Sequence, residues 1–328
     1  MNNPKILVIG ATGLVGSQIT KILADKGHDV TAMIRKEGTT ISDAPQSIKY
    51  VLGDLKDRNS LDNAVKGMDI VISTANGVIP PKGSGTAKFI NQLGSDNLIE
   101  ACELAGVKRF AQSSVPELSI GHQVPEIAGK RILENRLKQS TMESRIVRNP
   151  AFYDVWLVMG GFKQAENKDP HSTTLRSFGF MQTWKKAVGN FVKNHCLFIA
   201  PGGAKHGSVF IATIDVAHMI TAAALKDGEK YMVIESGGPE WLSWGEVANQ
   251  ISNKMNKKKV RVINLPAGAA RFFQLVMYPF SKSAANVMAL TRMVATYQPK
   301  WDSKPVVEYL DLPPQQTLKD YLDIHVKD

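Results

Sequence analysis

Residues 8–16, "VIGATGLVG", carry the strongest structural signal in the chain, because three glycines follow an apolar run and precede an amphipathic one. This spacing is typical of the turn between the first strand and first helix of a dinucleotide-binding unit. Gly10 permits the sharp turn, Gly13 lets backbone amides approach a pyrophosphate, and Gly16 allows close packing of helix on strand. The phosphates then lie at the positive end of the helix. The residues that we expect to bind the dinucleotide here are Gly10, Thr12, Gly13, Leu14, Val15 and Gly16.

Apolar runs rich in Ile and Val alternate with amphipathic stretches over the first 150 residues. Nearly continuous apolarity is typical of parallel strands that are buried on both faces, and the alternation indicates crossover helices. The predicted fold is therefore α/β, a doubly wound parallel sheet of the Rossmann type with a smaller mixed α/β region towards the C-terminus. The expected strands are residues 5–9, 29–34, 48–52, 69–73, 109–112 and 144–148.

The alternation becomes irregular after about residue 150, which indicates a second region. We expect residues 1–152 to form the NAD(P)-binding domain, with 208–227 returning to it and 213–227 forming a helix. Residues 153–207 and 228–328 would then form a smaller substrate-binding region. Within that region, residues 230–236 and 259–266 are expected to be strands.

The composition excludes several classes of protein. The chain has 328 residues with 43% hydrophobic and 21% charged side chains, which is ordinary for a soluble globular protein. Its only cysteines are Cys102 and Cys196, so we expect no disulfide framework and a cytoplasmic location. The seven histidines show no metal-ligand spacing, so we expect no metal. The N-terminus reads as a strand and not as a signal peptide.

The net charge of +10 raises the question of an anionic partner. Nucleic acid, an acidic membrane and anionic small molecules are all possible partners for a basic protein. No helix-turn-helix, zinc-finger or RNP pattern is present, so we expect no nucleic acid. No stretch predicts a transmembrane segment. The apolar stretch 265–295 leaves open a subunit interface or a helix lying on a membrane surface, and the protein is expected to be a monomer or a homodimer.

The residues after the second expected strand select the cofactor. An NAD site usually carries an acidic residue there, whereas this chain has Arg35 and Lys36. A guanidinium group suits a 2′-phosphate, so NADP(H) is the expected cofactor. Glu37 leaves NAD(H) possible.

Two further strand ends supply expected cofactor contacts. Asp54 and Leu55, in "GDLKD", are candidates for the adenine, and the alternative for an aspartate here is to cap the next helix. The small residues Thr74 and Ala75 leave room for the central part of the cofactor, and we assign Asn76 to the same site. Residues 76–89 are expected to form a loop over the nicotinamide.

These motifs together resemble the extended and atypical short-chain dehydrogenase/reductase superfamily, in particular its NmrA-like and isoflavone-reductase-like branch. The resemblance covers nearly the whole chain. It rests on "GATGLVG" (10–16), Arg35, "GDL" (53–55), "VKRFAQSSV" (107–115), "GKRILENRLKQS" (129–140), "RNPAFYD" (148–154), "FIATIDVAHMITAAAL" (210–225) and "ESGGPEWLSWGEVA" (235–248).

The resemblance implies a role for Lys130. Many members of the superfamily carry Tyr-x-x-x-Lys, whereas here Glu126 stands in the place of the tyrosine. The isoflavone-reductase-like branch also lacks the tyrosine but keeps the lysine, which contacts the nicotinamide ribose or acts as the acid/base. The alternative is that Lys130 forms a surface ion pair with Glu126 or Glu134.

Other side chains are expected near the substrate on the same grounds. The resemblance places a serine at the end of the fifth strand facing the substrate oxygen, which makes Ser113 a cofactor or substrate contact and Ser114 a catalytic candidate. The alternative is that both are strand-end hydroxyls that cap a turn. Asn149 and Tyr153 follow the sixth strand, at the edge where ligands bind in this architecture. Tyr153 is a candidate proton donor, and the alternative is a packed aromatic. Asp215 is expected to cap a helix without chemistry.

Two functions remain open from the sequence. The first is an NADP(H)-dependent reductase that acts on a small carbonyl, enone or quinone-like substrate. The second is a non-catalytic NADP(H)-binding redox sensor or accessory subunit of the NmrA type, which the missing tyrosine favours. Sugar-nucleotide epimerase chemistry is disfavoured because it requires the tyrosine.

Overall fold

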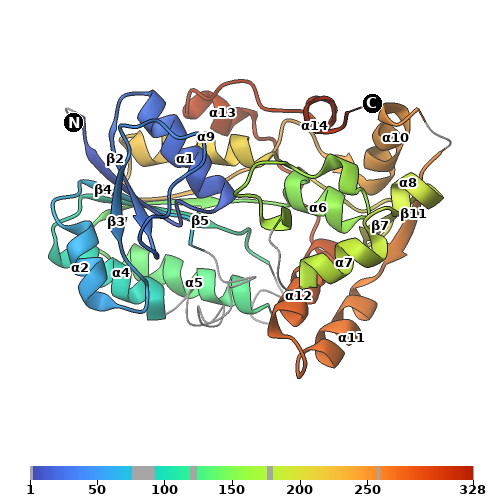
Figure 1. Ribbon diagram of the computed structural model, residues 1–328, viewed down its shortest axis with the longest axis horizontal. Coiled ribbons are helices and arrows are strands. Elements are labelled where there is room, and N and C mark those ends of the chain that lie inside the picture. The colour runs from blue at the N-terminus through green and yellow to red at the C-terminus, as the bar shows by residue number, and fades with distance from the viewer. Residues whose placement is uncertain (1–2, 76–92, 119–123, 176–179, 257–258, 328) are drawn as a thin grey trace.

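The computed structural model describes residues 3–75, 93–118, 124–175, 180–256 and 259–327, without the side chains of residues 125 and 126. A seven-stranded parallel sheet forms its centre (Figure 1), with the strand order β3-β2-β1-β4-β5-β6-β9. The order reverses between β1 and β4, as in a doubly wound fold. The strands are β1 (Lys5–Ile9), β2 (Asp29–Ile34), β3 (Lys49–Leu52), β4 (Ile70–Ser73), β5 (Arg109–Ser114), β6 (Glu143–Arg148) and β9 (Tyr231–Glu235).

Helices cover both faces of this sheet (Figure 1). On one face, α1 (Leu14–Asp25) and α9 (Thr213–Leu225) bury a cluster that includes Ile19, Val216 and Ile220. On the other face, α2 (Arg58–Val65), α4 (Leu93–Leu104) and α5 (Pro125–Lys138) bury a second cluster. The central strands are buried on both sides, which explains their continuous apolar runs. The predicted fold class is confirmed.

The second region lies beyond one end of the sheet (Figure 1). Its core contains Phe198, Phe210 and Trp244, and β7 pairs in parallel with β11. Its elements are α6 (Tyr153–Met159), η2 (Lys163–Ala165), η3 (Thr173–Leu175), α7 (Phe180–Val188), α8 (Phe191–His195), β7 (Leu197–Pro201), β8 (Gly207–Ser208), β10 (Leu242–Ser243), α10 (Trp244–Lys254), β11 (Arg261–Leu265), α11 (Ala267–Met277), α12 (Lys282–Thr296) and α14 (Leu318–His325). Helix α13 (Lys304–Tyr309) instead packs on the main sheet, because Val306 lies against the cluster that α1 and α9 bury.

The last strand of the sheet comes from late in the chain. The sequence prediction assigns residues 228–328 to the smaller region, but β9 pairs with β6 from Ser144–Tyr231 to Arg148–Glu235. This strand therefore belongs to the main sheet, and the chain passes from the sheet to the second region and back. Among the described residues, no helix is both long enough and apolar enough to cross a membrane.

Candidate functional site

The glycine turn brings α1 close to the ends of β1 and β4. Gly10 has a φ of +79°, which favours glycine, and a Cβ there would lie 2.7 Å from Oγ1 of Thr74. A Cβ on Gly16 would lie 2.2 Å from the carbonyl oxygen of Gly10. Both positions therefore require glycine for the fold itself.

Gly13 differs from the other two glycines. A Cβ there would meet only the carbonyl oxygen of Gly10, at an ordinary 3.4 Å, so the protein's own atoms do not demand glycine. Gly13 also caps the N-terminus of α1, whose first turn has no acidic residue and no side-chain cap. The amide of Gly13 itself donates to the carbonyl oxygen of Gly10 (2.9 Å), so the amides of the helical turn that follows are the ones suited to phosphate. The turn around Thr12, Gly13, Leu14 and Val15 therefore fits the pyrophosphate of a dinucleotide.

His171 of the second region anchors this turn, which the sequence did not indicate. Its Nδ1 lies 3.1 Å from the carbonyl oxygen of Thr12, and its Nε2 lies 3.1 Å from the amide nitrogen of Ser42. The neutral tautomer with its proton on Nδ1 satisfies both contacts, donating to Thr12 and accepting from Ser42. A lone histidine in a polar stretch carries no sequence signal for such a contact.

The ends of β2 and β3 hold the residues expected to bind the adenosine part of the cofactor. Arg35 and Lys36 are exposed directly after β2, beside the strand that leads into the glycine turn. Asp57, and not Asp54, caps α2 by accepting from the amides of Asn59 and Ser60. Asp54 accepts from the amide of Lys56 (3.0 Å), and Leu55 is buried below it.

Thr74 fixes the crevice at which the strand order reverses. Its amide and its hydroxyl both donate to the carbonyl oxygen of Ile9, at 3.0 and 3.1 Å. Because this contact joins the ends of β4 and β1, it closes the base of the crevice where dinucleotides bind in open α/β sheets. Asn76 and the expected loop 76–89 lie outside the described residues.

Lys130 is a buried residue of α5. The residue is 2% exposed, and its Nζ donates to the carbonyl oxygen of Ala75 (3.1 Å). This burial argues against the alternative that Lys130 forms an exposed ion pair on the protein surface. The contact holds the ammonium just past the end of β4. The side chain of Glu126 lies outside the described part of the chain.

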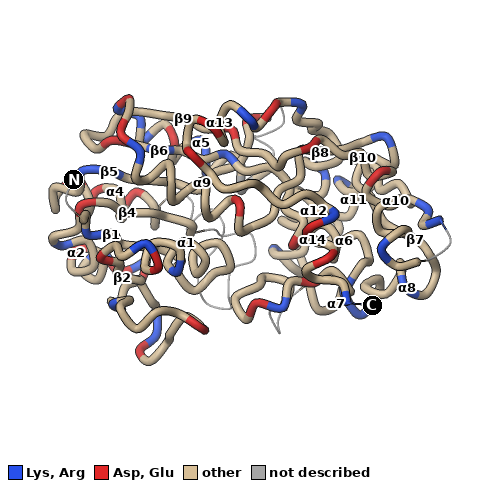
Figure 2. Tube along the Cα trace, turned by 90° about the horizontal axis from the view of Figure 1, so that it is seen from above, with Lys and Arg blue, Asp and Glu red and all other residues tan. Residues whose placement is uncertain are grey.

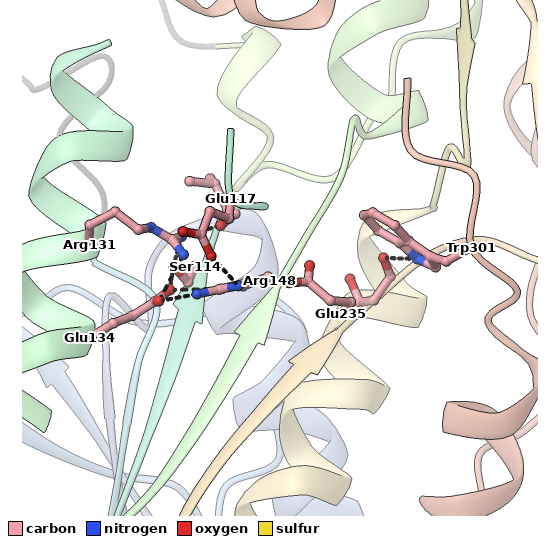
Figure 3. A network of polar contacts seen from close by, with 9 residues as sticks. Ser114, Glu117, Arg131, Glu134, Arg148, Glu235 and Trp301 are labelled. Carbon is pink, nitrogen blue, oxygen red and sulfur yellow. Dashed lines mark hydrogen bonds and ion pairs between the residues drawn. The ribbon is translucent and has the colours of Figure 1, made fainter. Parts of the chain in front are cut away.

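A buried ionic network lies at the ends of β5, β6 and β9 (Figure 3). Glu134, which is 3% exposed, accepts from Ser114 Oγ (2.6 Å), Arg131 Nη1 (2.8 Å) and Arg148 Nη2 (2.7 Å). Arg148 also binds Glu235 (2.9 Å) and Glu117 (3.4 Å). Burial opposes the charge on Arg148, but the carboxylates of Glu134 and Glu235 raise its pKa above the usual range. The network therefore ties α5 to the ends of β5, β6 and β9.

Ser113 and Ser114 have different surroundings. The hydroxyl proton of Ser114 is committed to Glu134. Ser113 Oγ accepts from Nδ2 of Asn149 (3.2 Å), and Oδ1 of Asn149 accepts from Ser236 (2.8 Å). Trp301 then donates to the carbonyl oxygen of Ser236 (Figure 3). The buried Asn149 thus links Ser113 to Ser236 through hydrogen bonds. Ser113 only accepts in this contact, so its hydroxyl proton can be donated elsewhere.

Tyr153 is packed inside the second region. It is 1% exposed and lies against Phe210 and Tyr321, with ring centroids 5.9 and 5.4 Å away. Burial raises the pKa of its hydroxyl well above the ordinary value. These facts favour the packed aromatic over the proton donor.

Asp215 does not cap α9. It lies inside the first turn of the helix, and the amide of Thr213 at the start of α9 instead donates a hydrogen bond to Asp154 (3.0 Å). Asp215 accepts from the amide of Gln316 (3.0 Å). Burial, together with the nearby carboxylate of Asp154, raises the pKa of Asp215 to about 7.

A cavity of about 470 Å³ opens next to the end of β9. Two indole side chains, Trp241 and Trp301, line it together with Lys300 and Lys304. Lys300 Nζ lies 5.8 Å from the centre of the Trp241 ring, within cation–π range. Among the described residues, no cluster of three or more His, Cys, Asp or Glu could hold a metal ion.

The chain is similar to known proteins over much of its length. The chain is 24% identical over 329 residues to the photosystem II assembly factor Ycf39 of Synechocystis, covering 97% of this chain and 89% of the relative. It is 34% identical over 118 residues to an isoflavone reductase homologue of Nicotiana tabacum, covering 33% of this chain and 34% of the relative. The resemblance to the isoflavone-reductase-like branch is confirmed.

A solved structure has the same fold. The NADPH-dependent quinone oxidoreductase QOR2 of Escherichia coli, in complex with NADPH, superimposes with a TM-score of 0.70 and 17% identity over 97% of this chain and 99% of its own. The family match itself runs over residues 10–194, from the glycine turn into the second region. The chain therefore belongs to the NAD(P)H-binding family, and the known proteins similar to it include reductases.

Proposed function

We propose that the chain is an NADP(H)-dependent reductase that transfers a hydride between the nicotinamide and a small carbonyl, enone or quinone-like substrate. The main support is the buried ammonium of Lys130, 3.1 Å from the carbonyl oxygen of Ala75 at the end of β4. Bound NADP(H) would supply the hydride. The protein would supply orientation, positive charge and a proton.

Each part of the site has a separate task in this proposal. The turn from Gly10 to Gly16 holds the pyrophosphate, and Arg35 with Lys36 binds the 2′-phosphate. Asp54 and Leu55 lie against the adenine. Lys130 binds the nicotinamide ribose and stabilises negative charge that develops on the substrate oxygen.

Ser113 is the proposed hydrogen-bond donor to the substrate oxygen. Asn149 donates to the Ser113 oxygen, and this contact orients the hydroxyl so that its proton points away from Asn149. Ser114 and Tyr153 receive no catalytic role, because one is committed to Glu134 and the other is buried among aromatic rings.

Turnover measurements on variants test the proposal. Lys130→Met keeps the apolar stem in its buried place and removes the charge, so turnover of NADPH with carbonyls and quinones is expected to fall about 100-fold. Lys138→Met, on the exposed last turn of the same helix, is the control and leaves the rate unchanged. Tyr153→Phe is expected to retain turnover. A Lys130→Met protein with full activity would remove the main support.

The second candidate is a cofactor sensor of the NmrA type. Two observations favour it. The hydroxyl of Ser114 donates to Glu134, and Tyr153 is buried, so the site has no tyrosine as proton donor. A sensor would bind NADP⁺ and NADPH with different affinity in fluorescence titrations and would turn over no substrate in the screen. Turnover that depends on Lys130 excludes this candidate.

A further inference from the structure

Helix α11 is apolar but scarcely buried. It has one buried residue, Ala270, although most of its side chains are hydrophobic. Phe272, Leu275 and Phe280 are 62%, 64% and 86% exposed. We call the exposed residues here the α11 surface: Phe272, Phe273, Leu275, Val276, Tyr278 and Phe280. Contiguous exposed apolar side chains on this scale mark an interaction site.

The position of α11 leaves this surface open. Figure 1 shows α11 at the outer edge of the second region, far from the N-terminal half of the sheet, with α12 on its inner side. Met277 packs against the cluster of Met181, Val287 and Met288. One side of α11 thus attaches it to the protein, and the other side carries the α11 surface.

The sequence on both sides of the α11 surface carries only positive charge. Between Glu246 and Asp302 the chain contains nine Lys or Arg and no Asp or Glu. Arg271 and Lys282, both exposed, border the α11 surface on either side in the sequence. A second stretch, between Asp169 and Asp215, holds five Lys or Arg and again no acidic residue. Figure 2 shows basic residues around α7, α8 and α10 at this end of the molecule.

We propose that the α11 surface binds an anionic lipid bilayer. Phenylalanine, leucine and tyrosine side chains flanked by lysine and arginine are the composition of helices that lie in a membrane interface. An eleven-residue helix is too short to span a bilayer, so α11 would lie on it. Lipid head groups of negative charge would balance the adjacent cations.

Charge also decides between a bilayer and a second copy of the chain. In a twofold dimer the same surface meets itself. Two α11 surfaces would then bring the exposed Arg271 and Lys282 of both copies together, and this repulsion is unfavourable. An anionic bilayer instead attracts them, so the lipid surface is the favoured occupant.

Vesicle flotation tests the proposal with the full chain. Vesicles of phosphatidylcholine with phosphatidylglycerol are expected to carry the protein upwards, and pure phosphatidylcholine vesicles to bind it at least tenfold less. The triple variant Phe272→Ser, Leu275→Ser, Phe280→Ser and the double variant Arg271→Glu, Lys282→Glu are each expected to lose at least tenfold in binding. High salt should weaken binding of the wild type.

Matched controls separate this effect from misfolding. Leu104→Ser removes a 76% exposed leucine from α4, and Lys66→Glu with Lys138→Glu makes the same charge change elsewhere. Both are expected to bind vesicles as the wild type does. NADPH titration checks that every variant is folded. Equal binding to neutral vesicles, unchanged binding of the triple variant, or a dimer in light scattering that the triple variant dissociates without any vesicle binding would each overturn the proposal.

Discussion

Glu134 and Arg148 form an ion pair of 2.7 Å in which the side chains are only 4% and 14% exposed. Removing one partner of such a pair leaves an uncompensated buried charge. Glu134→Gln is therefore expected to lower the free energy of unfolding by about 3 kcal/mol. Urea denaturation measures the change.

The matched control uses the same arginine. Glu117 also binds Arg148, but its side chain is 73% exposed and the contact is 3.4 Å long. Glu117→Gln should cost about 0.5 kcal/mol or less, since exposed ion pairs contribute little. Equal costs for the two variants would show that burial does not determine the strength of this network.

Gly16 is expected to tolerate no side chain. Because an added Cβ would lie 2.2 Å from a backbone oxygen, Gly16→Ala must displace α1 from the glycine turn. We expect NADPH affinity to fall at least tenfold, as measured by fluorescence titration. Gly268→Ala, on α11 with no atom within 4 Å of the new Cβ, should leave affinity unchanged and slightly raise stability.

Cofactor choice is expected to depend on Arg35. Arg35→Asp removes the proposed partner of the 2′-phosphate and adds a repelling charge, so the ratio of NADPH to NADH affinity should fall about 100-fold. Lys66→Asp makes the same change in net charge between α2 and the beginning of β4, whereas Arg35 follows the end of β2, so this control should leave the ratio as it is. A ratio unaffected by Arg35→Asp would contradict the assignment.

Asp215 should make stability depend on pH. Its folded-state pKa, about 7, lies above the ordinary value of 3.8, so folding favours the protonated carboxyl. The folded state then binds more protons than the unfolded state between these values, and stability falls as pH rises from about 4 to about 7. Asp215→Asn should remove this slope and raise the midpoint of thermal unfolding at pH 8. A variant whose stability still falls between about pH 4 and about pH 7 as steeply as that of the wild type would refute the assignment.

The sequence predicted the sheet well because the signal is local. Five strand predictions for residues 5–9, 29–34, 48–52, 69–73 and 144–148 match β1, β2, β3, β4 and β6 within a residue or so. Residues 109–112 fall within the longer β5. The run 230–236 also read as a strand, but nothing in its pattern identifies β6 as its partner.

The site was predicted less completely because its contacts are not local. The glycine turn has a spacing that sequence can show, and Lys130 could be singled out by resemblance. The network around Glu134 joins residues from α5 and three strand ends, so no spacing reveals it. His171 likewise reaches the glycine turn from 159 residues away.

The late arrival of β9 has a consequence for synthesis of the chain. The edge of β6 that will receive β9 has no strand partner until residues 149–235 have left the ribosome, which takes several seconds at ordinary rates. An unpaired strand edge is a template for wrong pairing. Nascent chains of this protein should therefore depend on chaperones during that interval, and a fragment that stops before residue 231 should aggregate although it contains the whole glycine turn.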